Sequence, residues 1–390
     1  MYEKRRDNRG RPLKTGESQR KDLTYQYRYT DIEGKRRTIY SRDLQELREK
    51  ETKLDQTLLR SPNYSMGTIT VLQLVRKYIS LKTKVSYGTK LGYKAVVNHL
   101  ESQEFGSRMI KDIKKSDAKQ WFIDMYDSGI KYYAIQNIRT VVKPAFDMAI
   151  EDEILYRNPF DFRQSDLLEK SDKRRAFLTR AQQKAWLEFL ATDAVYKKHY
   201  DEIVILLHTG LRVSEFCGLT RSDLDFKNRR ITVDHQLRRG PNSRRFITST
   251  KTKNGVRCIP MDDEAYASFQ NVLRNRVEPK IPMIIDGYSG FLFLTCNGKP
   301  KMANMVESAV TNACNKYNRC HPDNPLPHVT PHVLRHTFCT NMANSGMTVK
   351  SLQYLMGHAK AETTLDTYSH ESLDVAEEEM GKIVNISRAR

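Results

Sequence analysis

Apolar and polar residues follow two different periods near the start of the chain. Residues 24–30, Thr-Tyr-Gln-Tyr-Arg-Tyr-Thr, alternate between aromatic and polar side chains, which predicts a strand. After a segment with turn chemistry, residues 36–41 predict the returning strand. Leucines over residues 44–58 then fall along roughly one side of a helix, with Ser41 or Asp43 as its N-cap. We therefore expect a small sheet with one helix behind it.

A stretch rich in Pro, Gly, Ser and Asn at residues 60–67 predicts a linker. Beyond it, apolar residues from 71 to 79 repeat at positions i, i+3, i+4, i+7 and i+8, which is the spacing of an amphipathic helix. Four short helices in succession, separated by Gly106 and Gly129, predict a compact all-helical module. The further helical stretches are residues 89–100, 116–127 and 132–152.

The rest of the chain predicts a third domain after a charged second linker at residues 167–175. This domain is predicted to open with helices at residues 180–191 and 200–207, the second of which contains the apolar run at residues 203–207. More helix is predicted over residues 261–320, around a short apolar segment at residues 290–294.

A β-hairpin is predicted inside the third domain. Residues 246–252 and 256–260 have strand character, and Asn254-Gly255 lies between them. Asn-Gly is a strong hairpin signal because both turn positions require positive φ. Lys251 and Lys253 precede the turn and, being two apart on a strand, would share a face.

Length and charge limit the class of protein. A chain of 390 residues is too long for one ordinary core and allows two or three domains. Its 66 Lys and Arg residues outnumber its 47 Asp and Glu residues, giving a net charge of +19. This excess most often means a polyanionic partner, and a soluble basic protein is the plain alternative. Because no long apolar run, lipid anchor or signal peptide is found, we expect a cytoplasmic protein with no membrane partner.

Basic residues in the first two modules are candidates for contact with double-stranded DNA. The face of the predicted sheet turned away from its helix is expected to carry arginines, lysines and tyrosines, which suit phosphates and DNA grooves. The plain alternatives are a solvated basic hairpin and lysines that only keep a helical bundle soluble. The candidate DNA-binding residues are Arg28, Lys35, Arg36 and Arg37 in the first module and Lys82, Lys84 and Lys90 in the second.

Metal and cofactor sites are not expected. The six cysteines are scattered without a Cys-x-x-Cys pair, which argues against structural zinc. No acidic cluster has the spacing of a divalent-ion site. We therefore predict chemistry that uses neither a metal ion nor a cofactor.

Three stretches of the third domain carry residues suited to phosphate chemistry. His332 and Arg335 stand three apart in a run without a helix breaker, so a helix would place both on one face. Arg212 follows a glycine that ends an apolar run, and His358 and Tyr368 lie near the end of the chain. Each residue alone has an ordinary structural explanation. Their conjunction in a basic chain is what predicts phosphate chemistry.

Each residue type in this set suits one task in breaking a phosphodiester. The planar guanidinium binds two oxygens at once and stays protonated, so Arg212 and Arg335 can neutralise both non-bridging oxygens of one phosphate. Tyrosine, with a pKa of about 10, is a weak nucleophile at neutral pH, but nearby arginines and His332 as a base would favour the Tyr368 phenolate. A hairpin lysine can protonate the leaving 5′ oxygen. The candidate general acids are Lys251 and Lys253.

These stretches resemble the motifs of the tyrosine recombinases of the phage-lambda-integrase type. Residues 209–215 resemble the family's first-arginine box, and residues 332–336 its His-x-x-Arg box. Residues 355–358 resemble its third box, which ends in His or Trp, and Tyr368 stands where the family places its nucleophile. The chain is most similar to integrases of conjugative transposons and related integrative elements of Gram-positive bacteria, with a prophage origin left open.

The resemblance covers the whole chain and implies a multidomain fold, mainly α with small β-sheets. Residues 1–62 would form an arm-type DNA-binding domain made of a small sheet plus helix. Residues 66–163 would form a helical, SAM-like core-binding domain. Residues 172–390 would form the α+β catalytic domain with a C-terminal tail.

The family also implies an activity and a role for each residue. It implies a site-specific recombinase that integrates and excises a mobile element without a metal, through a 3′-phosphotyrosyl bond at Tyr368 and a Holliday junction. Arg212 and Arg335 would bind the scissile phosphate. His332 would handle protons near the attacking oxygen, and His358 would support the phosphate or the leaving group.

One family position is ambiguous in this sequence. The hairpin lysine of the family, counted from the proline that ends the second strand, would fall on Thr252, between Lys251 and Lys253. We favour Lys251 and retain Lys253.

The resemblance implies partners as well. These are double-stranded DNA with core-type and arm-type sites, a homotetramer on two DNA sites, an excisionase-type accessory factor and a host DNA-bending protein. An apolar stripe in the tail would dock on a neighbouring subunit or pack on its own domain; it comprises Val375, Ala376, Met380 and Ile383. The alternative functions are a type IB topoisomerase and a DNA-binding protein that has lost catalysis.

Overall fold

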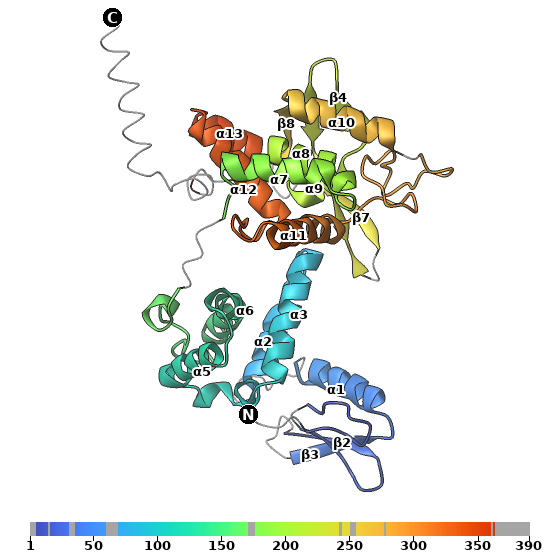
Figure 1. Cartoon of the computed structure of the whole chain (residues 1–390). Coiled ribbons are helices and arrows are strands. Elements are labelled where there is room, and N and C mark those ends of the chain that lie inside the picture. The colour runs from blue at the N-terminus through green and yellow to red at the C-terminus, as the bar shows by residue number, and fades with distance from the viewer. Residues whose placement is uncertain are drawn as a thin grey trace, which may run out of the picture. The chain divides into compact units, whose positions relative to one another are not determined.

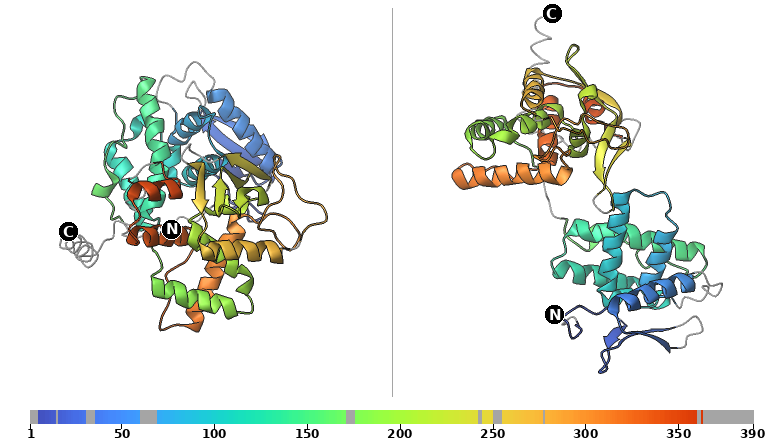
Figure 2. Two further views of the ribbon diagram at one scale, coloured as in Figure 1. Left: turned by 90° about the horizontal axis from the view of Figure 1, so that it is seen from above. Right: turned by 90° about the vertical axis from the view of Figure 1, so that its right-hand side faces the viewer.

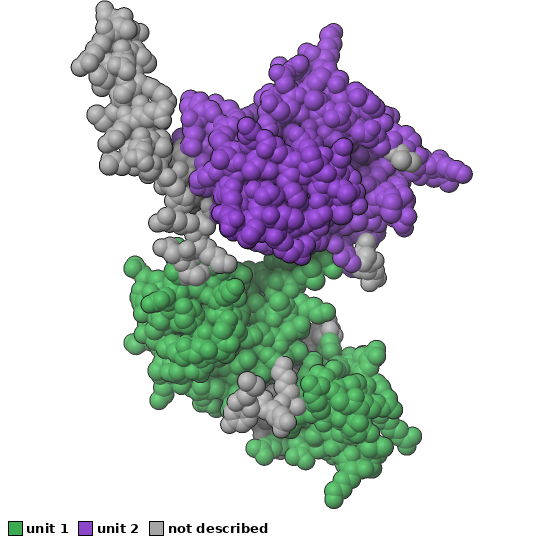
Figure 3. Space-filling view, viewed as in Figure 1, with its two compact units in different colours: residues 1–172 green, residues 173–390 purple. Residues whose placement is uncertain are grey.

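The structure, a computed structural model, describes residues 5–14, 16–30, 36–59, 69–170, 176–241, 244–249, 255–276, 278–359 and 362, with the backbone alone for residues 30 and 55–59. The chain divides into two units, Met1–Asp172 and Lys173–Arg390, which Figure 3 distinguishes by colour. Each unit has hydrophobic clusters of its own.

The first unit begins with a three-stranded antiparallel sheet followed by one helix. The strands are β1 (Glu17–Gln19), β2 (Tyr25–Thr30) and β3 (Arg36–Ser41), in that order, and the helix is α1 (Leu44–Leu59). The two predicted strands and the helix are confirmed, whereas β1 is not among the predicted elements. Asp43 caps α1, because its Oδ1 accepts the backbone N–H groups of Gln45 and Glu46 at 2.7 and 3.2 Å.

The strand register decides what each face of this sheet carries. Tyr25 packs against α1, and because side chains alternate along a strand, all tyrosines of β2 lie on the helix side. Arg37 pairs with Tyr29 and shares that side, whereas Arg28 and Arg36 lie on the open face. The expected mixture of arginines and tyrosines on one open face is therefore wrong for the tyrosines of β2.

Helices make up most of the rest of the first unit (Figure 1). One of them, α4, is additional to the four predicted, and Gly106 lies inside it rather than between helices. A Cβ on Gly106 would lie 2.2 Å from the carbonyl oxygen of Leu100, so glycine lets α4 pack on the end of α3. The helices are α2 (Val71–Ser80), α3 (Tyr87–Glu101), α4 (Glu104–Ser107), α5 (Lys115–Asp127) and α6 (Tyr132–Glu151).

The segment after α6 fills the centre of this helical module. The predicted helix over residues 132–152 is confirmed, because α6 ends at Glu151. Asn158 holds the segment that follows in place, donating from Nδ2 to the carbonyl of Lys143 at 3.0 Å. Phe160 is then fully buried, with ring centroids 5.1 to 6.1 Å from those of Phe105, Trp121, Phe122 and Phe146.

The second unit packs helices around two small sheets, as Figures 1 and 2 show. No helix in the described ranges of either unit is long and apolar enough to cross a membrane. The strands are β4 (Leu224–Asp225), β5 (Arg230–Val233), β6 (His235–Arg239), β7 (Arg245–Ser249) and β8 (Arg257–Pro260). The helices are α7 (Arg180–Thr192), α8 (Tyr200–Thr209), α9 (Val213–Gly218), α10 (Asp263–Asn275), α11 (Ala303–Cys320), α12 (Pro331–Asn344) and α13 (Val349–Met356).

The predicted hairpin between residues 246–252 and 256–260 is wrong. The sheets are β4-β5-β8 and β6-β7, so the two predicted strands pair with different partners. Burial explains the choice for β8, because Ile259 pairs with Ile231 of β5 and both lie in the core. Residues 250–254, which connect β7 to β8, lie outside the described residues.

The central helix of the second unit is α8. Its apolar run at residues 203–207 is buried, as expected for a helix that is hydrophobic all round. Helices α7, α10 and α12 pack against it. The C-terminal end of α8 is therefore held from several sides, and the candidate site lies at this end.

We expect Phe160→Ala to destabilise the helical module by about 3–5 kcal/mol, because it removes a large side chain from a closed core. Thermal unfolding of the full chain, followed by circular dichroism and calorimetry, measures the loss. Tyr156→Ala is the matched control, since Tyr156 is 101% exposed and its removal should leave the transition unchanged. Equal effects of the two substitutions would contradict this account of the core.

Candidate active site

Arg212 reaches its position because α8 ends at a left-handed glycine. Gly210 has φ +59°, a conformation that favours glycine. A Cβ on Gly210 would lie 2.4 Å from the ring of Phe338 in α12, so the two helices meet where no side chain fits. The chain then buries Leu211 and sets Arg212 at the N-cap position of α9. Arg212 is thus placed where α8, α9 and α12 converge.

Arg335 lies one turn into α12 on its buried side. Thr330 caps this helix and Pro331 takes the first helical position, which its fixed φ suits. Arg335 is 3% exposed; its Nη1 donates to the carbonyl of Gly210 at 2.5 Å, and its Nη2 donates to the carbonyl of Met356. Arg335 therefore joins the end of α8 to the end of α13.

The C-terminal end of α13 is bound by three arginines. The helix ends at Gly357, which has φ +61°, and the last carbonyls of a helix have no partner within it. Nε of Arg257 donates to the carbonyl of Leu355 at 2.6 Å, and Nη2 of Arg212 donates to that of Gly357 at 2.8 Å. With the bond from Arg335, three guanidinium groups bind three successive carbonyl oxygens. These carbonyls form the negative end of the helix dipole, which favours cations.

Glu215 is a buried carboxylate that Arg212 and Arg257 share. Its Oε1 accepts Nη1 of Arg212 at 2.7 Å and Nη1 of Arg257 at 3.1 Å. Its Oε2 accepts the backbone N–H of Arg212 at 2.9 Å and Nη2 of Arg257 at 2.8 Å. Burial by itself raises the pKa of Glu215, but the hydrogen bonds and charge of Arg257, with the charges of the other two arginines, lower it to about 2. Glu215 is therefore ionised and balances one of three positive charges.

The arginine cluster also sets the charge of His358. Burial, followed by the charges of Arg335 and Arg212, lowers the pKa of His358 to about 3, so this imidazole is neutral at pH 7. Burial and the charge of Arg212 likewise lower the pKa of Arg335 to about 9, which leaves it protonated. The site therefore offers two guanidinium groups and a neutral imidazole.

His332 lies one helical turn before Arg335, but its side chain is exposed whereas Arg335 is buried. The ring of His332 lies against that of His336, with centroids 4.3 Å apart and planes inclined by 75°. The charge of His336 in turn contributes to the low pKa of His358. His332 and His336 therefore form a pair of adjacent imidazoles on α12.

Several predicted site residues lie outside the described part of the chain. These are Tyr368, Lys251, Lys253 and Lys35, together with the apolar residues of the tail. Among the described DNA-binding candidates, Arg28, Arg36 and Arg37 are on the N-terminal sheet, and Lys82, Lys84 and Lys90 are exposed between α2 and α3 or on α3.

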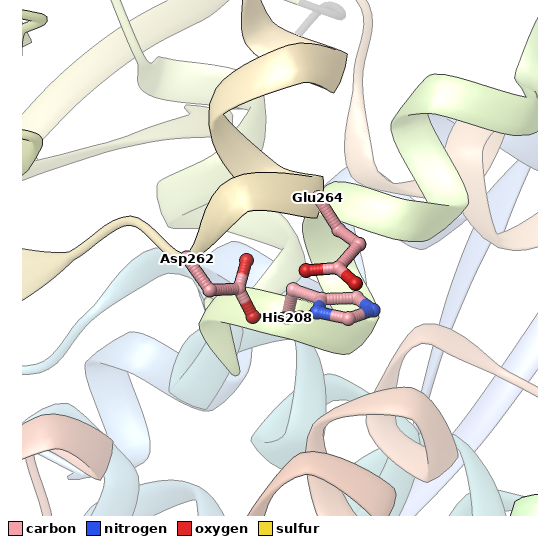
Figure 4. A group of neighbouring side chains, drawn as sticks. All are labelled: His208, Asp262 and Glu264. Carbon is pink, nitrogen blue, oxygen red and sulfur yellow. Dashed lines mark hydrogen bonds and ion pairs between the residues drawn. The ribbon is translucent and has the colours of Figure 1, made fainter.

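A histidine and two carboxylates meet beside the active-site end of α8. Figure 4 shows His208 of α8 with Asp262 and Glu264 from the start of α10. His208 Nδ1 lies 2.7 Å from Asp262 Oδ2, while Asp262 Oδ1 accepts the backbone N–H of Ala265 and caps α10. The positive end of a helix dipole disfavours a cation, so this group is better explained as a brace between α8 and α10 than as a metal site.

A second group of this kind, formed by Asp223, Asp234 and His235, has most of its atoms in use. His235 Nδ1 lies 2.5 Å from Asp234, and its Nε2 lies 2.8 Å from the carbonyl of Gly218. Asp223 Oδ2 accepts both the N–H and the hydroxyl of Thr220 at 2.7 Å. These bonds fasten β6 to the end of α9 and leave few ligand atoms for an ion.

A cavity of about 1390 Å³ lies at the opposite end of α8 from Gly210. The described residues that line it include none of the candidate catalytic residues, so it is separate from the arginine cluster. Its lining includes Tyr200, Glu202, Arg276, Phe293 and Lys301.

Two residues of the cluster, Glu215 and Arg257, are not among the predicted site residues, yet the sequence carries a signal for each. Glu215 follows Arg212 by three residues, the spacing at which a carboxylate closes a capping box. Arg257 stands two residues before Ile259 in a strand, so it shares the buried face. An arginine on a buried face requires partners, and those partners could not be named from the sequence.

Comparisons with known proteins agree along the whole chain. Residues 176–374 match the phage integrase family, and residues 1–58 match the DNA-binding domain of Tn916 integrase. The transposase from transposon Tn916 of Enterococcus faecalis is 44% identical over 98% of this chain and 97% of its own length. The tyrosine recombinase XerC of Bacillus pumilus is 25% identical over 78% of this chain and 92% of its own length.

Solved structures give the same result. The Tn1549 transposon integrase in complex with a circular intermediate DNA is 45% identical and has a TM-score of 0.76, covering 81% of this chain and 99% of that one. A lambda integrase dimer bound to a core site, at 16% identity and a TM-score of 0.56, shares the fold over 95% of this chain and 98% of its own. The chain therefore belongs to the phage integrase family, the tyrosine site-specific recombinases.

Proposed function

We propose that this protein is the integrase of a conjugative transposon, which breaks and rejoins DNA at specific sites through a covalent bond to Tyr368. The observation that carries the proposal is the arginine cluster, in which Arg212 and Arg335 are held against one helix end beside His358. Relatives named for Tn916 and for Tn1549 support the transposon as the element that is moved.

The cluster is suited to a phosphodiester because its charge is incompletely balanced. Three guanidinium groups surround one carboxylate, so the positive charges exceed the negative by two. Burial, followed by the charge of Arg212, lowers the pKa of Arg335. A phosphate anion would relieve the repulsion between arginines that are already in position, and preorganised charge of this kind is usually the largest catalytic term.

Strand cleavage is a transesterification that conserves the number of phosphate esters. The Tyr368 oxygen attacks phosphorus while the bond to the 5′ oxygen breaks, which leaves a 3′-phosphotyrosine and a free 5′ hydroxyl. We assign proton transfer near the attacking oxygen to His332. Lys251 or Lys253 is assigned to protonate the leaving oxygen. In rejoining, a 5′ hydroxyl from the partner strand attacks phosphorus and Tyr368 is released.

His358 is assigned the role of hydrogen-bond donor to the phosphate or the leaving group. It is neutral at pH 7, so it contributes a directed N–H rather than a charge.

Each of the three predicted domains would have its own task in recombination. Residues 1–62 would bind arm-type sites, residues 66–163 would bind core-type sites, and residues 172–390 would carry out catalysis. Four subunits would exchange strands in pairs through a Holliday junction; a lambda integrase tetramer bound to a Holliday junction supports this assembly. We include an excisionase-type accessory factor as the expected regulator of direction.

Replacement of Tyr368 by Phe should abolish covalent attachment to DNA while leaving DNA binding unchanged, because only the attacking oxygen is removed. The test uses a nicked suicide duplex that spans the joined ends of the element, in the presence of EDTA, with adducts resolved by denaturing electrophoresis and mapped by mass spectrometry. Adduct formation at another tyrosine, or none by the wild-type protein, would contradict the proposal. A second DNA site then distinguishes strand exchange from the relaxation expected of a topoisomerase.

His358→Trp should retain cleavage within about 10-fold of wild type, because the indole also presents one N–H donor. His358→Phe, of similar shape but without a donor, should lose about 100-fold or more. Single-turnover rates of adduct formation at pH 7 measure both. Equal rates for the two variants would show that His358 does not act as a hydrogen-bond donor in cleavage.

Arg36→Gln should weaken binding of the arm-type DNA site and lower the salt slope of log K by about 0.9, the value for one lost phosphate contact. Arg37→Gln is the matched control, since Arg37 lies on the helix side of the sheet and Arg36 on the open face. Fluorescence anisotropy on duplexes from the element ends, over a range of salt concentrations, gives both slopes. A larger effect for Arg37 would place the DNA on the other side of the sheet.

A further inference from the structure

We propose that Arg257 is a positioning residue for strand cleavage, which holds Glu215 and the end of α13 so that Arg212 and His358 face the same phosphate. The proposal rests on the proposed function and adds to it a residue outside the predicted catalytic set.

Arg257 makes a network of hydrogen bonds inside the protein. Nε donates to the carbonyl of Leu355 at 2.6 Å, and Nη1 donates to that of Gly255 at 3.1 Å. Nη1 and Nη2 bind the two oxygens of Glu215 at 3.1 and 2.8 Å. The residue is 3% exposed, so its guanidinium is directed at protein groups rather than at DNA. Arg257 can therefore affect catalysis only by positioning the groups that it binds, which are Glu215 and the end of α13.

Glu215 connects Arg257 to Arg212. Glu215 accepts both the backbone N–H and the Nη1 of Arg212, so its position fixes the direction of that side chain. Arg257 and Arg212 share the negative charge of Glu215. The charge of Arg212 is therefore less fully balanced by Glu215, and Arg212 attracts a phosphate more strongly. Without Arg257, Glu215 would be balanced mainly by Arg212, and the attraction for an anion would fall.

The carbonyl of Leu355 connects Arg257 to the segment that carries His358. Leu355 is the third residue before His358, and the carbonyls of the residues between them are bound by Arg335 and Arg212. Arg257 thus provides the first of three bonds that fix the segment carrying the imidazole. Lysine cannot replace these contacts, because a single ammonium group lacks the planar arrangement that binds both carboxylate oxygens and a carbonyl together.

The test compares Arg257→Met and Arg257→Lys with wild type on two suicide duplexes. One carries an ordinary scissile phosphate and the other a methylphosphonate, in which a neutral methyl group replaces one charged oxygen. Arg229→Met is the control, because it removes an exposed arginine that pairs with Asp263 in the same unit. Thermal unfolding and DNA affinity are measured for every variant.

Arg257→Met should cleave the phosphate substrate about 10- to 100-fold more slowly, as is typical when a supporting partner is lost, with little change in DNA affinity. Its defect should be several-fold smaller on the methylphosphonate, because less charge remains for Arg212 to stabilise. Arg257→Lys should behave in the same way, and Arg229→Met should match wild type on both substrates. If Arg257→Met does not fold, the ratio measured for Arg257→Lys decides the question.

Two results would overturn the proposal alone. One is wild-type cleavage by both Arg257 variants; the other is an equal loss on both substrates that matches the loss of folded protein, which indicates a role in stability alone. A wild-type protein that forms no adduct would instead overturn the proposed function on which the inference rests.

Discussion

Three arginines bound to one helix end are the interaction on which the catalytic unit depends. The carbonyls of Leu355, Met356 and Gly357 each accept a hydrogen bond from a different guanidinium, and the arginines come from β8, α12 and the start of α9. The last carbonyls of a helix lack partners within it and carry its negative dipole, so cations are well suited to them. Segments far apart in the sequence are thereby fixed around one point.

The same arrangement brings three positive charges close together, and this unbalanced charge is what suits the site to an anion. Burying like charges together is costly, and Glu215 relieves only part of that cost. Two left-handed glycines, Gly210 and Gly357, let the helix ends approach closely enough for the arginines to meet. Gly210 in particular leaves no room for a side chain against Phe338. Stability is given up locally so that an anion can restore it, which is a common property of functional sites.

The sequence predicts the elements of this fold better than their partners. Helices α2 and α6 follow from apolar periodicity and α8 from a continuous apolar run, and Arg212, Arg335 and His358 could be selected by residue type and order. The partners of β7 and β8 could not be predicted. Nothing in the residues of a short strand specifies the strand with which it pairs, and the Asn-Gly signal indicates a turn without showing which strands it joins. The link from Arg257 to Glu215 spans 42 residues of sequence, and spacing alone does not reveal such a contact.

The left-handed end of α13 also limits where the proposed nucleophile can lie. Tyr368 follows Gly357, whose carbonyl is bound by Arg212, by 11 residues. Eleven residues of chain span at most about 40 Å, whatever their conformation. The anchoring of one helix end therefore sets the farthest distance from the arginine cluster at which Tyr368 of the same subunit can lie, as well as the charge at that cluster.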